Sequence, residues 1–173
     1  MKKLRVVQVN EIEGFCPESM GGSYISRLLI EAEGVGSSRL MLVHATLKPS
    51  SSPGDGAAHP APYDEAYYVL RGQGRMEFGD EDEPYEVGPD TAIFIPAGTM
   101  HKITNTGEGD LEFLTIWPLT PTEEGVNGVY DERKRRWGTS FRRAALGFAS
   151  SREQKPTGAD PTAAPRAACA GTA

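Results

Sequence analysis

The sequence has little of what several classes of protein require. Its 173 residues include only two cysteines, Cys16 and Cys169, and only three histidines. Two cysteines in such different sequence contexts provide neither a disulfide framework nor the ligand spacing of a zinc site. The sequence therefore argues against a disulfide-stapled scaffold and against a cysteine-rich zinc module.

Positive charge and long apolar runs are also scarce. Lysine and arginine number 18 against 24 aspartates and glutamates, for a net charge of −6. Nucleic-acid binding uses a basic face, so this balance argues against a nucleic-acid partner. The apolar runs have the length of strands rather than of membrane spans, and Leu4 to Val9 is too interrupted by polar residues to be the core of a signal peptide. We expect a cytoplasmic protein with no membrane partner.

What is present is a series of short strand patterns separated by turn residues. No helical pattern alternates with them, so the sequence predicts an all-β sandwich or barrel of the jelly-roll type. Both faces of the third segment are largely apolar, which predicts a strand that is covered on both sides. The expected strands are Leu4–Val9, Tyr24–Glu31, Leu40–Leu47, Ala66–Leu70, Arg75–Phe78, Tyr85–Val87, Ala92–Ile95, His101–Asn105 and Leu111–Trp117.

The character of the chain changes after Pro118. Tyr130, Trp137 and Phe141 recur at helical separations, which predicts a short helix that is broken near Gly138 and packs its aromatic side chains on the barrel. Residues 149–173 contain no large aliphatic or aromatic side chain, so this segment is expected to be a disordered tail. The predicted organisation is a β-barrel domain over residues 1–118, an extension over 119–148 and the tail over 149–173.

Two short segments carry the functional signal. In chain order their key residues are His59, Glu65 and Gly72, followed by Pro96, Gly98, His101 and Asn105. In this order and at this separation they resemble the two signatures of the cupin superfamily. The resemblance implies a cupin-type jelly-roll barrel, also called a double-stranded β-helix, with a metal site inside it.

The two segments depart from the family pattern at three positions. Pro53 and Asp90 stand where glycines are usual, and Asp tolerates a left-handed backbone better than most residues. Ala61 stands where the family has its second metal-binding histidine, and a methyl group cannot bind a metal. The resemblance therefore implies a reduced ligand set of His59, Glu65 and His101.

Two imidazoles and one carboxylate are the ligands of facial-triad iron(II) oxygenases, and they also suit catalytic zinc. The leading hypothesis is a small-molecule metalloenzyme with Fe2+, an Fe(II)-dependent oxygenase, while Zn2+, Mn2+ and Ni2+ remain open. The alternatives are a metal-assisted isomerase or epimerase, cyclase or lyase. A non-catalytic cupin that binds a small molecule is a further alternative, since the superfamily includes all of these.

Other residues near the two segments are candidates for pocket and catalytic roles. Tyr67 and Met76 are expected in the pocket wall. Tyr63, Asp64 and His44 are the candidates for a general base, and His44 could also replace the missing ligand. Residue parity along the strand points Glu65 inward and leaves Asp64 as the less favoured ligand.

Two further expectations concern partners. The basic run Arg133–Arg136, with Arg142 and Arg143, could meet an anionic substrate or the acidic face of a partner, although a charged face of a solvated helix is the usual interpretation of such a run. The chain is expected to act on a small-molecule substrate and to form a homodimer, as small cupins commonly do.

Overall fold

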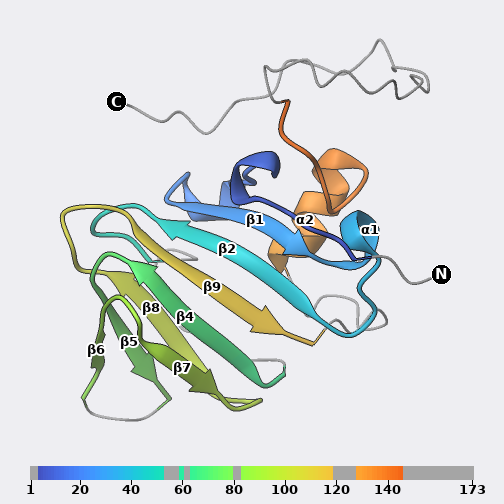
Figure 1. Cartoon of the computed structure of the whole chain (residues 1–173). Coiled ribbons are helices and arrows are strands. Elements are labelled where there is room, and N and C mark those ends of the chain that lie inside the picture. Colours follow the sequence, from blue (N-terminus) through green and yellow to red (C-terminus); the bar gives the residue numbers. More distant parts are fainter. Residues whose placement is uncertain (1–3, 53–58, 61–62, 80–82, 119–127, 146–173) are drawn as a thin grey trace, which may run out of the picture.

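The computed structural model describes residues 4–52, 59–60, 63–79, 83–118 and 128–145. Within these residues the chain forms two antiparallel β-sheets that face each other, with short helices beside the larger sheet (Figure 1). The larger sheet has the order β1 (Tyr24–Ile30), β2 (Met41–Leu47), β9 (Leu111–Trp117), β4 (Glu65–Arg71) and β7 (Ala92–Ile95). The smaller sheet has the order β3 (His59–Pro60), β8 (Met100–Asn105), β5 (Gly74–Phe78) and β6 (Tyr85–Val87). The predicted all-β jelly roll is confirmed.

Eight of the nine predicted strands are present within one or two residues of their expected bounds. The prediction of a first strand over Leu4–Val9 is wrong. Leu4 and Val6 are exposed, and the described chain forms no strand before Tyr24. The N-terminal segment instead contains two 3-10 turns, η1 (Val9–Glu11) and η2 (Glu18–Met20), and it meets the sheet through an isolated bridge between Phe15 and Ser26.

The main core lies between the two sheets. It joins Ala45, Val69 and Phe113 of the larger sheet to Met76 and Ile103 of the smaller one. Strand β2 is buried at every position except Leu42, which confirms the prediction that it is covered on both sides. One face of β2 therefore belongs to the barrel interior and the other lies under the N-terminal segment.

Two tight turns depend on backbone conformations that few residues adopt. Gly72 has a φ of 88°, and a Cβ atom there would lie 2.6 Å from the carbonyl oxygen of Asp110. Only glycine therefore fits the turn between β4 and β5. Asp90 has a φ of 64°, which confirms that aspartate supplies the left-handed backbone where the family usually has glycine.

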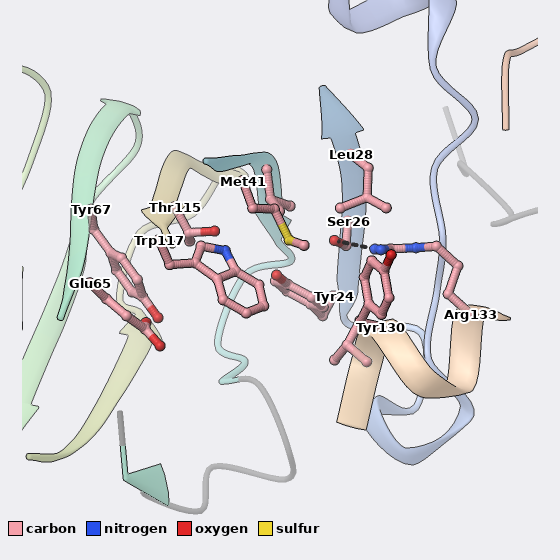
Figure 2. Close-up of a pocket in the computed structure, with 12 residues that line it drawn as sticks. Tyr24, Ser26, Leu28, Met41, Glu65, Tyr67, Thr115, Trp117, Tyr130 and Arg133 are labelled. Carbon is pink, nitrogen blue, oxygen red and sulfur yellow. Dashed lines mark hydrogen bonds between the residues drawn. The ribbon is translucent and has the colours of Figure 1, made fainter. Parts of the chain in front are cut away.

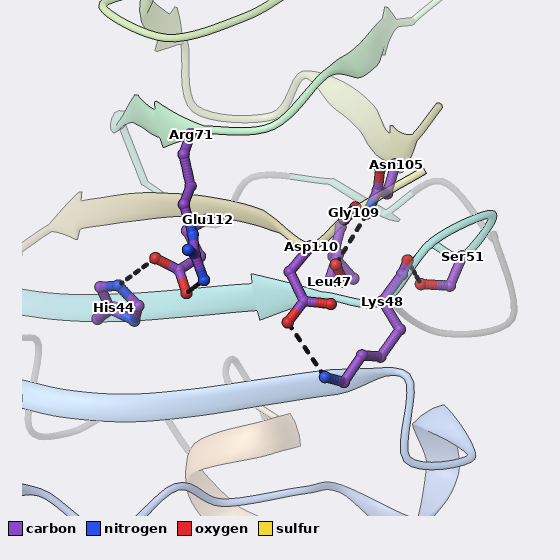
Figure 3. A network of polar contacts seen from close by, with 9 residues as sticks. All are labelled: His44, Leu47, Lys48, Ser51, Arg71, Asn105, Gly109, Asp110 and Glu112. Carbon is purple, nitrogen blue, oxygen red and sulfur yellow. Dashed lines mark hydrogen bonds and ion pairs between the residues drawn. The ribbon is translucent and has the colours of Figure 1, made fainter. Parts of the chain in front are cut away.

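Asn105 ties three chain segments together at the end of the barrel. Its side-chain amide donates to the carbonyl oxygens of Leu47 and Gly109, at 2.9 and 2.8 Å, and its own oxygen accepts from the backbone N–H of Gly107 (Figure 3). The asparagine of the second motif is thus a buried structural group.

The C-terminal extension contains the predicted helix, α2 (Gly128–Trp137), which ends before Gly138 with a φ of 73°. Tyr130 packs on the cluster formed by Leu28, Met41 and Val43, and Trp137 meets Phe15 edge to face. The helix therefore does place aromatic side chains against the sheet. A short helix that was not predicted, α1 (Ala32–Val35), follows β1.

Some sequence expectations fall outside the described residues. These include the tail over 149–173, and Pro53 and Ala61 of the first motif. No helix in the described part of the chain is long and apolar enough to cross a membrane.

Candidate functional site

A cavity of about 110 Å³ opens inside the barrel, between the larger sheet and α2 (Figure 2). Glu65 and Tyr67 of β4 form one end of its wall and Arg133 of α2 lies at the other. Between them the lining is made of Tyr24, Ser26, Leu28, Met41, Val43, Thr115, Trp117, Val129 and Tyr130. The cavity therefore joins residues of the first motif to the C-terminal helix.

His101 is buried beside this cavity with its ring held in a defined tautomer. Its Nδ1 lies 3.2 Å from the carbonyl oxygen of Thr99, and a carbonyl can only accept, so Nδ1 carries the proton of the neutral ring. Burial lowers the pKa of His101, which favours that neutral form. The neutral ring thus carries its lone pair on Nε2, the atom that faces Tyr67 and Glu65.

The Glu65 carboxylate lies opposite this lone pair. Its Oε2 is 3.9 Å from His101 Nε2. Burial raises the pKa of Glu65 to about 7, against a hydrogen bond from the Tyr67 hydroxyl that lowers it. Asp64 by contrast is exposed and accepts from the backbone N–H of Ala97, so the parity prediction that Glu65 faces inward is confirmed.

Tyr67 supplies the only hydroxyl that the described residues direct to both groups. Its oxygen lies 3.3 Å from His101 Nε2, and its ring stacks on Phe113, which fixes its position. Burial raises the pKa of Tyr67 well above its usual value, so the phenol keeps its proton.

The donor chemistry of this pair fits a divalent cation. Two ligand atoms that share a tetrahedral ion, or adjacent positions of an octahedral one, at ligand distances of about 2.0 to 2.2 Å lie about 2.8 to 3.6 Å apart. The observed 3.9 Å is slightly wider, so binding of one ion by both residues requires a small movement of their side chains. Strand register makes His59 the backbone partner of His101, although the His59 side chain lies outside the described part of the structure. Among the described residues no third ligand-type side chain joins the pair.

Arg133 is the functional candidate whose role was misjudged from the sequence. It is only 2% exposed, whereas its neighbours Lys134 and Arg135 are exposed. The expectation of a wholly solvated basic face is therefore wrong, because the first arginine of the run turns inward. Arg133 lies three residues after Tyr130 and four before Trp137, and this spacing places it on the same face of the helix as these aromatic residues. The spacing was the sequence signal for its burial.

The Arg133 guanidinium is buried with no carboxylate at ion-pair distance among the described residues, although the charge of the buried Glu31 carboxylate acts on it. The guanidinium donates to the Ser26 hydroxyl at 2.7 Å (Figure 2). It also lies over the Phe15 ring, and it forms no ion pair with the described residues. Burial lowers the pKa of Arg133 to about 10, so the group remains charged near neutral pH. A buried, charged guanidinium with unused N–H groups is suited to binding an anion inside the cavity.

The remaining predicted residues lie elsewhere. Met76 is wholly buried in the core cluster and is not part of the cavity lining. Tyr63 is half-buried and Asp64 is exposed, and neither lines the cavity. His44 lies on the opposite face of β2, where it meets Glu112, so it does not reach the Glu65 and His101 pair.

Residues 43–117 match the protein family described as Cupin domain. Among curated proteins, the chain is 40% identical over 52 residues to an oxalate-binding protein of Thermotoga maritima, which covers 30% of this chain and 41% of that protein. It is 41% identical over 51 residues to an uncharacterised protein of Methanocaldococcus jannaschii, which covers 30% of this chain and 39% of that protein. The chain thus spans about two fifths of the length of the curated relatives it matches.

Two solved structures share the fold over most of the chain. A polyketide cyclase of Streptomyces resistomycificus superimposes with a TM-score of 0.60 and 22% identity, over 75% of this chain and 98% of the other. A predicted oxalate decarboxylase of Thermotoga maritima gives a TM-score of 0.56 and 28% identity, over 67% of this chain and 100% of the other. These likenesses support the cupin-type jelly roll.

Proposed function

Because residues 43–117 match the cupin domain and the fold is a cupin-type jelly roll, we propose that the chain is a metal-dependent enzyme acting on a small molecule. The leading form of the proposal is an Fe(II)-dependent oxygenase whose ligands are His59, Glu65 and His101. The observation that supports it best is the buried pair of Glu65 and His101, whose Oε2 and Nε2 atoms lie 3.9 Å apart.

A site of two histidines and one carboxylate supplies an iron(II) centre with open positions for a substrate and for O₂. The chain's own residues hold this arrangement in place. The Thr99 carbonyl orients the His101 ring, and the stacked Tyr67 keeps a hydroxyl beside Glu65. Such outer contacts fix the tautomer and direction of a metal-binding imidazole.

Arg133 gives the proposal a substrate class. The guanidinium lies in the wall of the same cavity as Glu65, and the lining between them includes the apolar side chains Met41 and Trp117. A small acid with its carboxylate on Arg133 would extend along the cavity, past these apolar side chains, toward Glu65 and His101. The name of the oxalate-binding relative agrees with a small carboxylic acid as the ligand.

The second candidate is a metal-assisted isomerase or epimerase, cyclase or lyase. None of the predicted bases Tyr63, Asp64 and His44 lines the cavity, but the phenols of Tyr24 and Tyr130 do, and a phenol can pass a proton to or from a substrate. The third candidate is a binding protein without turnover, which the name of the oxalate-binding relative favours.

The deciding experiment measures metal content first and oxygen consumption second. The purified chain, loaded with Fe2+ or with Zn2+, is mixed with a panel of small keto acids, hydroxy acids and phenolic acids in air and under argon. Oxygen uptake that needs Fe2+ and stops under argon supports the oxygenase. Turnover that persists under argon or with Zn2+ alone contradicts it and supports the second candidate. Tight binding without turnover supports the third.

A further inference from the structure

A second cavity lies on the outer face of the larger sheet. It measures about 560 Å³ and is lined by Gln8, Val9, Asn10, Arg27, His44 and Glu112. Arg27 of β1 lies opposite His44 of β2 in the sheet. The chain neighbours of both residues face the barrel interior, so the side chains of Arg27 and His44 face outward. The two cavities share no lining residue and lie on opposite faces of the same strands.

His44, which lines this outer cavity, carries an unsatisfied polar atom. The residue is 5% exposed, and its Nδ1 is buried with no hydrogen-bond partner among the described residues. Leaving such a group unpaired costs about 1 to 3 kcal/mol, so native proteins seldom do it without a reason.

The other ring nitrogen fixes which partner Nδ1 needs. Nε2 faces the Glu112 carboxylate at 3.5 Å, and a carboxylate only accepts, so the proton of the neutral ring is on Nε2 (Figure 3). Burial lowers the pKa of His44, against the Glu112 charge that raises it. Nδ1 therefore carries a lone pair, and its missing partner is a hydrogen-bond donor.

The charges around the cavity indicate the sign of the ligand's charge. Glu112 is already paired with Arg71, whose Nη2 lies 2.8 Å from Oε1 (Figure 3). Arg27 forms no ion pair with the described residues. Two guanidiniums against one carboxylate leave an excess of positive charge, which disfavours an ammonium or metal ion and favours an anion.

We propose that the outer cavity is a second ligand site for a small hydroxylated carboxylate. In this site the carboxylate binds Arg27, and a hydroxyl group donates a hydrogen bond to Nδ1 of His44 after a small movement of the side chains that cover this buried atom. Gln8 and Asn10 also line the cavity, and their side-chain amides are suited to binding further hydroxyl groups. The proposal does not rest on the metal site or on any reaction in the barrel.

The test compares three probes of similar length that differ in one feature each. Gluconate has both a carboxylate and hydroxyl groups, hexanoate has only the carboxylate, and sorbitol has only the hydroxyl groups. Titration calorimetry on the full chain should show gluconate binding at least tenfold more tightly than either of the other two, since it alone satisfies both Arg27 and His44. Equal affinities for gluconate and hexanoate, or for gluconate and sorbitol, overturn the proposal.

Substitutions of residues in the outer cavity test whether gluconate binds there. Arg27→Gln and His44→Leu should each weaken gluconate binding at least tenfold, and Lys102→Gln, which removes one positive charge from the smaller sheet, should leave it unchanged. Unfolding midpoints measured without ligand show whether each variant is folded. Gluconate binding that survives both cavity substitutions, or that is lost only in Arg133→Gln, overturns the outer site.

A second measurement does not depend on the variants. In protein labelled with 15N-histidine, gluconate should shift the Nδ1 resonance of His44 and leave the ring resonances of His101 in place. A shift confined to His101 would assign the ligand to the barrel and contradict the proposal.

Discussion

The Glu65 carboxylate and His101 Nε2 face each other across 3.9 Å, although the two residues belong to different sheets. Glu65 opens β4 of the larger sheet and His101 lies in β8 of the smaller one. The pair therefore forms only when the two sheets close over the core, and a metal ion bound by both residues would link the sheets directly.

Metal binding should depend on His101 and not on His44. His101→Ala removes a ligand and should abolish binding of one divalent ion per chain, measured by elemental analysis after dialysis. His44→Ala is the matched control, because this buried histidine lies on the opposite face of β2. Metal content retained by His101→Ala would contradict the assignment.

Ala61→His should strengthen metal binding, since it restores the histidine that the cupin pattern has at this position. Competition with a chelator measures the change in affinity. Unchanged affinity would show that residue 61 does not face the ion. In the parent protein and in Ala61→His alike, occupancy of the metal site should fall below about pH 6, because a histidine ligand must be neutral to coordinate.

The metal-free protein should lose stability as the pH rises through about 7. Burial raises the pKa of Glu65 from 4.5 to about 7, so the folded state binds this proton more tightly than the unfolded chain does. The stabilisation that comes from this proton is complete below about pH 4.5 and is lost above pH 7. The free energy of unfolding should therefore fall by an amount on the order of 2 to 3 kcal/mol over this range.

Glu65→Gln removes the ionisation that causes this loss. Its free energy of unfolding in urea should exceed that of the parent by about 2 kcal/mol at pH 8.5 and differ little at pH 5, both without metal. Glu83→Gln, at an exposed carboxylate, should show no such pH dependence. A parallel pH profile for the parent and Glu65→Gln would contradict the prediction.

Arg133 should control the affinity for small acids. Arg133→Met keeps the apolar stem and removes the charge, so binding of oxalate to the metal-loaded protein should weaken about tenfold to hundredfold. Arg135→Met, at an exposed position of the same helix, should change it little. Titration calorimetry measures both, and equal affinities in the two variants would show that the acid does not reach Arg133.

Asn105 should matter for stability rather than for binding. Asn105→Ala leaves the carbonyl groups of Leu47 and Gly109 without their buried donor, which should cost about 2 to 4 kcal/mol. Thr106→Ala, at the exposed neighbour, should stay within about 0.5 kcal/mol. Urea unfolding measures both changes, and a loss below about 1 kcal/mol for Asn105→Ala would contradict the structural role.

The sheets could be predicted because each strand carries its own signal. The alternation along Glu65–Arg71 placed Glu65 and Tyr67 inward, and glycine and aspartate marked the turns at Gly72 and Asp90. Leu4–Val9 has the same local pattern and is not a strand. A strand needs a partner edge, and local sequence does not report whether one is available.

The site was only partly predictable for a similar reason. The candidate ligands came from the spacing of residues within two motifs, which is a local feature of the sequence. The resemblance of these motifs to a metal site predicted that Glu65 and His101 lie close together, and they do. The burial of Arg133 depends on how α2 docks against β1. The basic run itself does not indicate which of its residues turns inward, and only the spacing of Arg133 from Tyr130 and Trp137 does. The outer cavity likewise depends on the N-terminal segment lying over Arg27 and His44, which no short pattern encodes.

The guanidinium of the barrel cavity comes from α2, outside residues 43–117 that match the domain family. The groups proposed to hold the metal and the group proposed to choose the substrate are thus encoded in separate stretches of the chain. A homologue can inherit the barrel unchanged and acquire a new specificity by altering the appended helix alone. For the same reason, a library confined to α2 is the direct route to redirecting this scaffold toward neutral or cationic compounds.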